Sequence, residues 1–407
     1  MPAAELFLET TQDDDFWVNS CRVPLRIGVD WLINGTPESR IIADRMANWI
    51  DTGQTFTHIV RPGYHLDGTY EAGWNTLRTA FIAPMGVAAM TGSPTLLNDI
   101  YAKVRTEQDD YYDDCLNLLS MLIMGNTYFD PTVHEARAQV APFYPLGFFF
   151  PYTTGHDSPT NYNFQQRLAD IKTFYDYWLT EYVIDEGLDG SGNQMYRVPL
   201  SQSAPDDAQT VSEGIGYGML IMVHMAGYET SAQEYFDGYW YFAKDNPSPN
   251  VSTFMDWKVP ETGTDESKTS GDLDMAAALI LAHHQWGSNS GTVNYQAEAI
   301  ILLDALYQYC VGGGAAPDTV NQRPNVSAGP DKQVIFPATI SLVGTATDDG
   351  LPSGTLTYEW SLFSGFGQVT FTTPNATTTN MQVSGPGVYV VKFIANDGLL
   401  WGEDTAT

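Results

Sequence analysis

Residues 269–286 read TSGDLDMAAALILAHHQW, and this stretch indicates how most of the chain folds. Two acids precede a strongly apolar run that ends at Trp286, with the three- and four-residue spacing of a helix. The same spacing recurs along the chain, and loops carrying Gly, Pro, Asn and Asp separate the runs. The runs predicted to be helices are 22–33, 37–51, 76–90, 96–107, 111–126, 163–183, 213–227, 232–246, 272–287 and 294–311.

The chain changes character near residue 312. Residues 1–311 show no alternation of strands and helices, which excludes a parallel α/β sheet and predicts a mostly α domain. Residues 312–324, GGGAAPDTVNQRP, are typical of a linker. In residues 325–407, Thr, Val and Ser dominate and the period falls to two, which predicts a small all-β sandwich. Because residues 402–407 resemble the start of a last strand, we expect this sandwich to be truncated.

Charge narrows the classes of partner. The chain has 49 acidic and 18 basic residues and a net charge of −31. This excludes nucleic acid and anionic membranes as partners, and it fits a cationic polymer or a surface adapted to salt. Aromatic residues make up 13% of the chain, and they suit either stacking on sugar rings or filling a large core. No run of 18 apolar residues and no signal peptide is visible, so we expect no membrane span.

The cysteines and the search for metal-ligand spacings give little information about fold or function. Cys21, Cys115 and Cys310 are too few and too scattered for a disulfide framework. Each lies in an apolar helical context, so we expect buried thiols. No spacing typical of metal ligands appears, and we expect no metal and no cofactor.

A glycine-rich acidic motif, VSEGIGYGM at 211–219, is the first candidate site. Ser212 is expected to cap a helix, which places Glu213 in the first turn, where the helix dipole favours a carboxylate. A capping acid is the simpler interpretation. Three glycines would weaken a helix that needed only a cap, however, and glycine permits another segment or a ligand to approach closely. The motif therefore favours a functional Glu213.

Two further acidic stretches accompany it. Asp272 and Asp274 precede the apolar helix, either as an acidic first turn or as partners of Glu213 in one cleft. Nearby like charge raises the pKa of one carboxyl, and the general acid of a glycosidase needs such a shift. The acid-rich residues 5–15, which include Glu9, are on their own most simply a solvated loop.

Several motifs together resemble glycoside hydrolase family 8, in particular the branch that contains bacterial chitosanases. The matching stretches are VSEGIGYGMLIMVHMAGY at 211–228, TSGDLDMAAALILAHHQWGSNSGTVNY at 269–295, GYHLDGT at 63–69, FIAPMGVAA at 81–89, YYDDCLNLLSMLIMGN at 111–126, and FLE at 7–9 followed by VNSCRVPLRIGVDWLINGT at 18–36. The resemblance implies an (α/α)6 barrel with a long cleft that hydrolyses β-1,4 links in polysaccharides with inversion.

The resemblance also implies roles for single residues. Glu213 matches the general acid. The usual base, an aspartate three residues before the arginine of the R-V-P motif (Arg22 here), is replaced by Asn19, and an amide cannot accept a proton as a carboxylate does. The chitosanase branch also carries Asn there and uses an upstream Glu, which matches Glu9. Glu9 would then activate the water that Asn19 orients, and chitosan is the expected polymer.

Further residues are expected around the substrate. Asp272 and Asp274 would line the cleft and hold sugar hydroxyls or amines, and Arg22 would lie beside them. Tyr217 and Trp257 are the expected stacking side chains. Ser270 stands where the family usually has an aspartate that contacts the central sugar.

The order of the motifs departs from the family. Motifs of the family's C-terminal part occupy residues 5–131 and those of its N-terminal part occupy 146–311, which predicts a circular permutation bridged by 128–145. About ten helices are visible where the barrel needs twelve, so the barrel is expected to be incomplete. We expect a monomer, or a dimer if a partner chain completes the barrel.

Residues 325–405 resemble immunoglobulin-like domains of the polycystic-kidney-disease (PKD) type, in AGPDKQVIFPATISLVGTATDDG at 328–350, LTYEWSLFSG at 356–365 and GVYVVKFIANDG at 387–398. Such domains accompany secreted bacterial hydrolases, so the resemblance implies an extracellular protein. Two other interpretations of the whole chain stay open: a β-glucanase acting on mixed-linked or β-1,4-glucan, and a barrel that binds polysaccharide without cutting it.

Overall fold

The computed structural model describes residues 12, 14–53, 63–69, 78–131, 144–150, 152–200, 209–260, 267–288, 293–311, 324–348, 355–365, 367–397 and 401–407. The chain divides into two compact units, Met1–Val311 and Gly312–Thr407, and each is described by itself. The predicted base Glu9 and the linker residues 312–323 lie outside the described residues.

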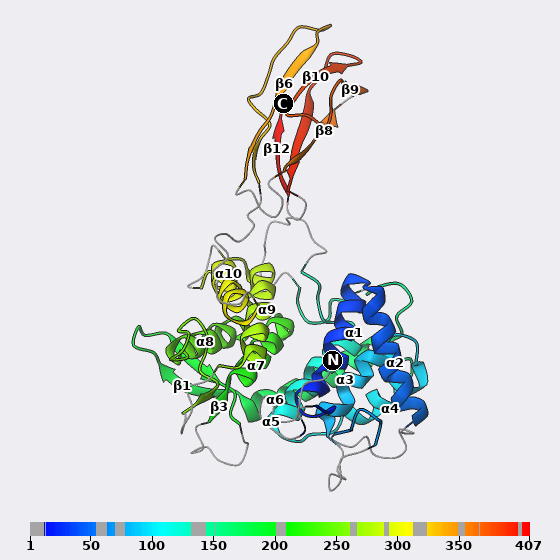
Figure 1. Cartoon of the computed structure of the whole chain (residues 1–407), viewed down its shortest axis with the longest axis vertical. Coiled ribbons are helices and arrows are strands. Elements are labelled where there is room, and N and C mark those ends of the chain that lie inside the picture. Colours follow the sequence, from blue (N-terminus) through cyan, green and yellow to red (C-terminus); the bar gives the residue numbers. More distant parts are fainter. Residues whose placement is uncertain are drawn as a thin grey trace. The chain divides into compact units, whose positions relative to one another are not determined.

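The described part of the first unit contains ten α-helices, each within a few residues of a predicted run (Figure 1). They are α1 (Val23–Asn34), α2 (Pro37–Gly53), α3 (Thr79–Ala89), α4 (Pro94–Val104), α5 (Tyr111–Met124), α6 (Phe164–Tyr182), α7 (Ser212–Met225), α8 (Ala232–Asp245), α9 (Thr269–Trp286) and α10 (Tyr295–Leu306).

These helices form five pairs. The odd-numbered helices α1, α3, α5, α7 and α9 pack against one another in chain order, and each also packs against the helix that follows it. In Figure 1, α5 and α6 accordingly lie between α1–α4 and α7–α10. This inner-and-outer arrangement is that of an (α/α) barrel, with five of its six pairs present among the described residues.

The inner helices α3, α5 and α7 are the most completely buried. All 11 residues of α3 are buried, and Glu213 is the one residue of α7 that is not. A helix that is apolar on every side can be stable only when neighbours surround it, as α3 and α7 are surrounded. The outer helix α8 instead buries one stripe, which includes Phe236 and Trp240, and exposes its other face.

Short strands in the first unit were not predicted. β1 (Ile184–Leu188) and β2 (Gln194–Arg197) form an antiparallel hairpin, and β3 (Thr210–Val211) pairs with β4 (Lys258–Val259). The Asp189 side chain accepts hydrogen bonds from the backbone N–H groups of Ser191 and Asn193 at 2.8 Å, and so closes the hairpin turn. These strands are too short to produce a clear period of two in the sequence.

The cysteine prediction is correct for two of three residues. Cys21 and Cys115 are buried and free, whereas Cys310 is exposed. Cys310 lies in a π-helical turn, Tyr307–Val311, that contains no buried residue. No helix among the described residues is long and apolar enough to span a membrane.

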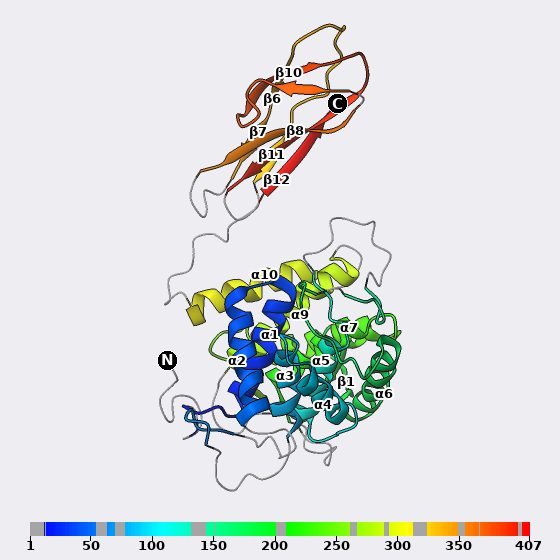
Figure 2. The same cartoon turned by 90° about the vertical axis from the view of Figure 1, so that its right-hand side faces the viewer.

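The second unit is the predicted β-sandwich (Figure 2). One sheet has the order β6 (Ile340–Val343), β10 (Thr378–Val383), β9 (Val369–Phe371), and the other β12 (Trp401–Ala406), β11 (Tyr389–Asn396), β8 (Thr357–Gly365). β5 (Asn325–Ser327) pairs with β7 (Thr345–Thr347). In the core of this sandwich, the rings of Trp360 and Phe393 stack with their centroids 4.6 Å apart.

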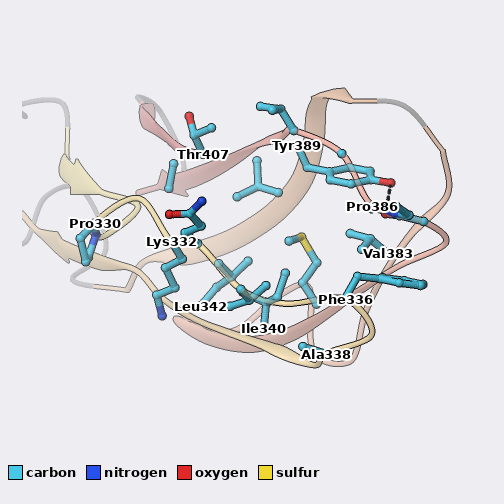
Figure 3. A pocket seen from close by; sticks show the side chains of 18 residues that line it. Pro330, Lys332, Phe336, Ala338, Ile340, Leu342, Val383, Pro386, Tyr389 and Thr407 are labelled. Carbon is cyan, nitrogen blue, oxygen red and sulfur yellow. Dashed lines mark hydrogen bonds between the residues drawn. The ribbon is translucent and has the colours of Figure 1, made fainter.

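A cavity of about 310 Å³ opens in this sandwich (Figure 3). Apolar side chains of both three-stranded sheets line it, including Leu342, Val383 and Val391, and the Tyr389 hydroxyl beside it donates to the Gly385 carbonyl at 2.9 Å. No aspartate or glutamate is among the residues that line it, so this cavity lacks the carboxyl groups of a glycosidase.

Candidate active site

A second cavity, of about 260 Å³, lies where the inner helices α1, α5 and α7 begin. Their sequences bring polar and aromatic side chains together at the amino-terminal ends of helices. The residues that line it are Val18, Asn19, Arg22, Tyr111, Tyr112, Leu200, Val211, Glu213, Trp257 and Lys258. Four residues predicted from the sequence, Asn19, Arg22, Glu213 and Trp257, are therefore brought together.

Glu213 is the carboxylate of this cavity. It is the single acid among the described residues that line it, and the only residue of α7 that is not buried. Ser270, at the start of α9, donates a hydrogen bond to Glu213 Oε1 at 3.1 Å. The Ser212 hydroxyl donates to the other oxygen, Oε2, at 3.4 Å.

Ser212 does not cap the helix as predicted. α7 begins at Ser212 itself, the N-cap is Val211, and no side chain makes a capping hydrogen bond there. The Ser212 backbone N–H donates instead to the Trp257 carbonyl at 2.9 Å, and β3 pairs with β4 immediately before the helix. Strand pairing thus fixes the entry into α7.

The glycines of α7 do permit close approach, as predicted. A Cβ atom on Gly216 would lie 2.7 Å from Asp274 Cβ and 3.0 Å from the Gly271 carbonyl oxygen. A Cβ atom on Gly271 would lie 2.5 Å from Ser212 Oγ. The first turns of α7 and α9 are therefore in direct contact, and this contact brings Ser270 to Glu213.

Arg22 forms another wall of the cavity. Its guanidinium donates to the Asn19 side-chain oxygen at 3.0 Å and to the Tyr217 hydroxyl at 3.2 Å. Because these bonds connect α7 to the 3-10 turn that precedes α1, they fix the Asn19 amide at the cavity. The predicted stacking role of Tyr217 is wrong, because its ring is 0% exposed and offers no face to a sugar.

Aromatic side chains cover much of the lining. Trp257 is half-buried, and the Lys268 ammonium lies 4.5 Å from the centre of its ring. Tyr111 and Tyr112, at the start of α5, also line the cavity, and sequence reasoning did not assign them a role. Their position in the first turn of a long buried helix, in YYDD at 111–114, is the signal that could have identified them.

Asp272 and Asp274 do not line this cavity, so that prediction is wrong. Both are buried, at 0% and 2% exposure. Asp274 is paired with Arg26 of α1, and Asp272 Oδ1 accepts the Met255 backbone N–H at 3.2 Å. They form the contact between α9 and its neighbours rather than a surface for sugar.

The sequence predicts that clustered acids raise the pKa of one carboxyl, and in the structure this carboxyl is that of Asp272. Burial, with a smaller contribution from the negative charge of Glu213, raises the pKa of Asp272 to about 7. Its Oδ2 is buried without a hydrogen-bond partner. Asp272 is thus a carboxyl that holds its proton up to near neutrality, adjacent to the candidate acid.

The second carboxylate of the predicted pair, Glu9, lies outside the described residues. Among the residues that the structure describes, no group of three or more His, Cys, Asp or Glu side chains could hold a metal ion.

Each of the two units contains a match to a known family. Residues 165–320 match Glycosyl hydrolases family 8, and residues 328–406 match a PKD domain family. The chain is 37% identical over 176 residues to a "Beta-glucanase" of Niallia circulans, which is 42% of this chain and 40% of that protein. It is 30% identical over 210 residues to "Endoglucanase A" of Acetivibrio thermocellus, which is 49% of this chain and 39% of that protein.

The chain thus spans about two fifths of the length of these relatives. Among solved structures, a β-1,3-1,4-glucanase from Paenibacillus sp. X4 is 40% identical over 34% of this chain and 35% of the other, with a TM-score of 0.29.

Proposed function

Residues 165–320 belong to glycoside hydrolase family 8, and from that premise we propose that this chain hydrolyses internal β-1,4 links of a polysaccharide. The observation that carries the proposal is Glu213, the one side chain of a buried helix that reaches an aromatic-walled cavity, where two hydroxyls hold it.

Glu213 acts in this proposal as the general acid. Its carboxyl proton passes to the glycosidic oxygen as the bond between that oxygen and C1 breaks. Water attacks C1 from the opposite face, and a second carboxylate accepts the proton of that water, which inverts the configuration. We assign the second role to Glu9, with Asn19 orienting the water. Such carboxyl pairs lie about 6.5–9.5 Å apart in inverting enzymes.

We favour a neutral β-glucan as the substrate. The described lining contains two cations, Arg22 and Lys258, and one carboxylate, Glu213. A third cation, Lys268, lies over the ring of Trp257, the side chain that we expect to stack on a sugar. A cationic polymer would meet like charges here, whereas a neutral polymer would not. The named relatives are a β-glucanase and an endoglucanase.

Chitosan is the second candidate, favoured by two other observations. The net charge of −31 attracts a cationic polymer at long range, and Asn19 stands where the chitosanase branch also carries asparagine. If long-range attraction dominates, hydrolysis of chitosan will slow as ionic strength rises, while hydrolysis of a neutral glucan will not.

The circular permutation is part of the same proposal. The family match covers 165–320, yet Asn19, Arg22 and the tyrosines of α5 come from the part of the chain before it and line the same cavity as Glu213. We also propose that the protein is extracellular, because a PKD domain follows the helical unit. We propose further that it acts as a monomer or as a dimer whose barrel is completed in trans.

The test is reducing-end release from mixed-linked β-glucan and from chitosan at two salt concentrations. Glu213→Gln is compared with Glu38→Gln, a control on the exposed first turn of α2. We expect release from β-glucan that Glu213→Gln lowers at least a hundredfold and Glu38→Gln leaves unchanged. Binding of either polymer without any new reducing ends would replace this proposal by the non-catalytic one.

A further inference from the structure

Ser270 is in direct contact with the candidate acid. Its hydroxyl donates to Glu213 Oε1 at 3.1 Å, across the boundary between α9 and α7. Ser212 contacts the other carboxyl oxygen at the longer distance of 3.4 Å. Each oxygen of Glu213 thus has one hydroxyl partner, and the shorter bond is the one from Ser270.

The backbone holds Ser270 in this place. Gly271 follows it directly and lies so close to α7 that a Cβ atom there would be 2.6 Å from the Ser212 carbonyl carbon. A Cβ atom on Gly216 of α7 would in turn lie 3.0 Å from the Gly271 carbonyl oxygen. Since both close approaches involve backbone atoms, they hold the Ser270 backbone beside Glu213.

We propose that Ser270 is a positioning residue that fixes the Glu213 carboxyl toward the cavity; this rests on the function proposed above. A hydrogen bond donated to a carboxylate stabilises the charged form over the protonated one. A general acid works only while protonated, so the pH profile of a variant that lacks this hydroxyl tests the contact.

Other charged or titratable groups also face Glu213. They are Arg22 before α1, Tyr111 on α5, Tyr217 on α7, Lys258 on β4 and Asp272 on α9. None of them is altered when Ser270 alone is replaced, so a change in the pH profile of such a variant reports the lost hydroxyl. Ser270→Thr keeps the hydroxyl and serves as the matched control.

The experiment measures kcat and KM on mixed-linked β-glucan against pH for the parent, Ser270→Ala and Ser270→Thr. For Ser270→Ala we expect the alkaline midpoint to rise by about 0.5 to 1 pH unit, which corresponds to the loss of one hydrogen bond. We also expect kcat to fall about tenfold with KM within about twofold, because orientation is lost and binding is not. Ser270→Thr should keep the parent profile.

A Ser270→Ala profile that coincides with that of the parent, or a Ser270→Thr profile that moves equally far, would overturn the proposal. The same contact is read without activity from the titration of ¹³C-labelled glutamate carboxyls, in which Glu213→Gln removes the assigned signal. A parent that does not hydrolyse any polymer but whose Glu213 signal shifts in Ser270→Ala would refute the proposed function and leave the Ser270 contact established. An unshifted signal would refute the contact itself.

Discussion

Replacing Gly216 by alanine should separate the two helices that hold the candidate acid. The added Cβ would lie 2.7 Å from Asp274 Cβ, 3.0 Å from the Gly271 carbonyl oxygen and 3.4 Å from the Met275 backbone nitrogen. Two of these neighbours are backbone atoms of α9, so no rotation of a flexible side chain can relieve the overlap.

The size of the effect follows from comparison with Gly214 in the same helix. A Cβ atom on Gly214 would meet Val198 at 3.5 Å, an ordinary contact. Both changes gain up to about 1 kcal/mol in helix propensity, which cancels in the difference between the two variants. Overpacking costs about 1–3 kcal/mol. We therefore expect Gly216→Ala to be about 1–3 kcal/mol less stable than Gly214→Ala.

The assay is urea unfolding followed by the helical circular dichroism signal, with reducing-end release measured on the same samples. Gly216→Ala should also lose activity, because Ser270 moves away from Glu213 with α9. If Gly216→Ala and Gly214→Ala unfold at the same urea concentration, the contact between α7 and α9 is not close enough to position the acid.

Three further predictions concern the buried titratable groups and the cavity wall. His224 is buried, neither ring nitrogen has a hydrogen-bond partner, and burial lowers its pKa to about 3. Its contribution to stability is therefore complete above pH 6.5 and is lost toward pH 3, by up to about 1.4 kcal/mol per pH unit. In urea unfolding at pH 4 and pH 7, His224→Phe should lose less unfolding free energy than the parent at the lower pH. A His224→Phe variant with the same pH dependence as the parent would contradict this prediction. Burial raises the pKa of Asp272 to about 7, so its contribution is largest below pH 3.8 and is lost as pH rises through 7. Asp272→Asn, which can still accept the Met255 N–H, should gain stability relative to the parent between pH 4 and pH 8, and equal differences at the two pH values would refute this. Trp257→Ala should raise KM for β-glucan about three- to tenfold with kcat within about twofold; an unchanged KM would remove Trp257 from the binding surface.

The helical architecture was predictable because outer helices such as α2, α4 and α8 carry a strong helical period, whereas inner helices such as α3 and α7 are long apolar runs bounded by loop residues. All ten predicted runs correspond to helices in the described residues, with ends shifted by a few residues. The short strands β1 to β4 were missed, since two to five residues show no clear period and their pairing is set by the turn at Asp189 and by the tertiary contacts of Trp257.

The candidate site was predictable in part. Glu213, Asn19 and Arg22 were identified from motifs, and the structure brings them to one cavity. Motifs do not show which side of a helix faces the cavity, so the buried Tyr217 and Asp274 were wrongly assigned to the substrate surface. Tyr111 and Tyr112 were missed because two tyrosines at the start of an apolar helix are equally typical of a core.

The most direct test of Glu213 as the general acid compares two substrates in one variant. A polysaccharide needs a proton on its leaving group, whereas an aryl β-cellobioside with a dinitrophenolate leaving group does not. We predict that Glu213→Gln loses at least a hundredfold in kcat on mixed-linked β-glucan but less than about tenfold on the aryl substrate. Equal losses on both substrates would contradict the assignment of Glu213 as the acid.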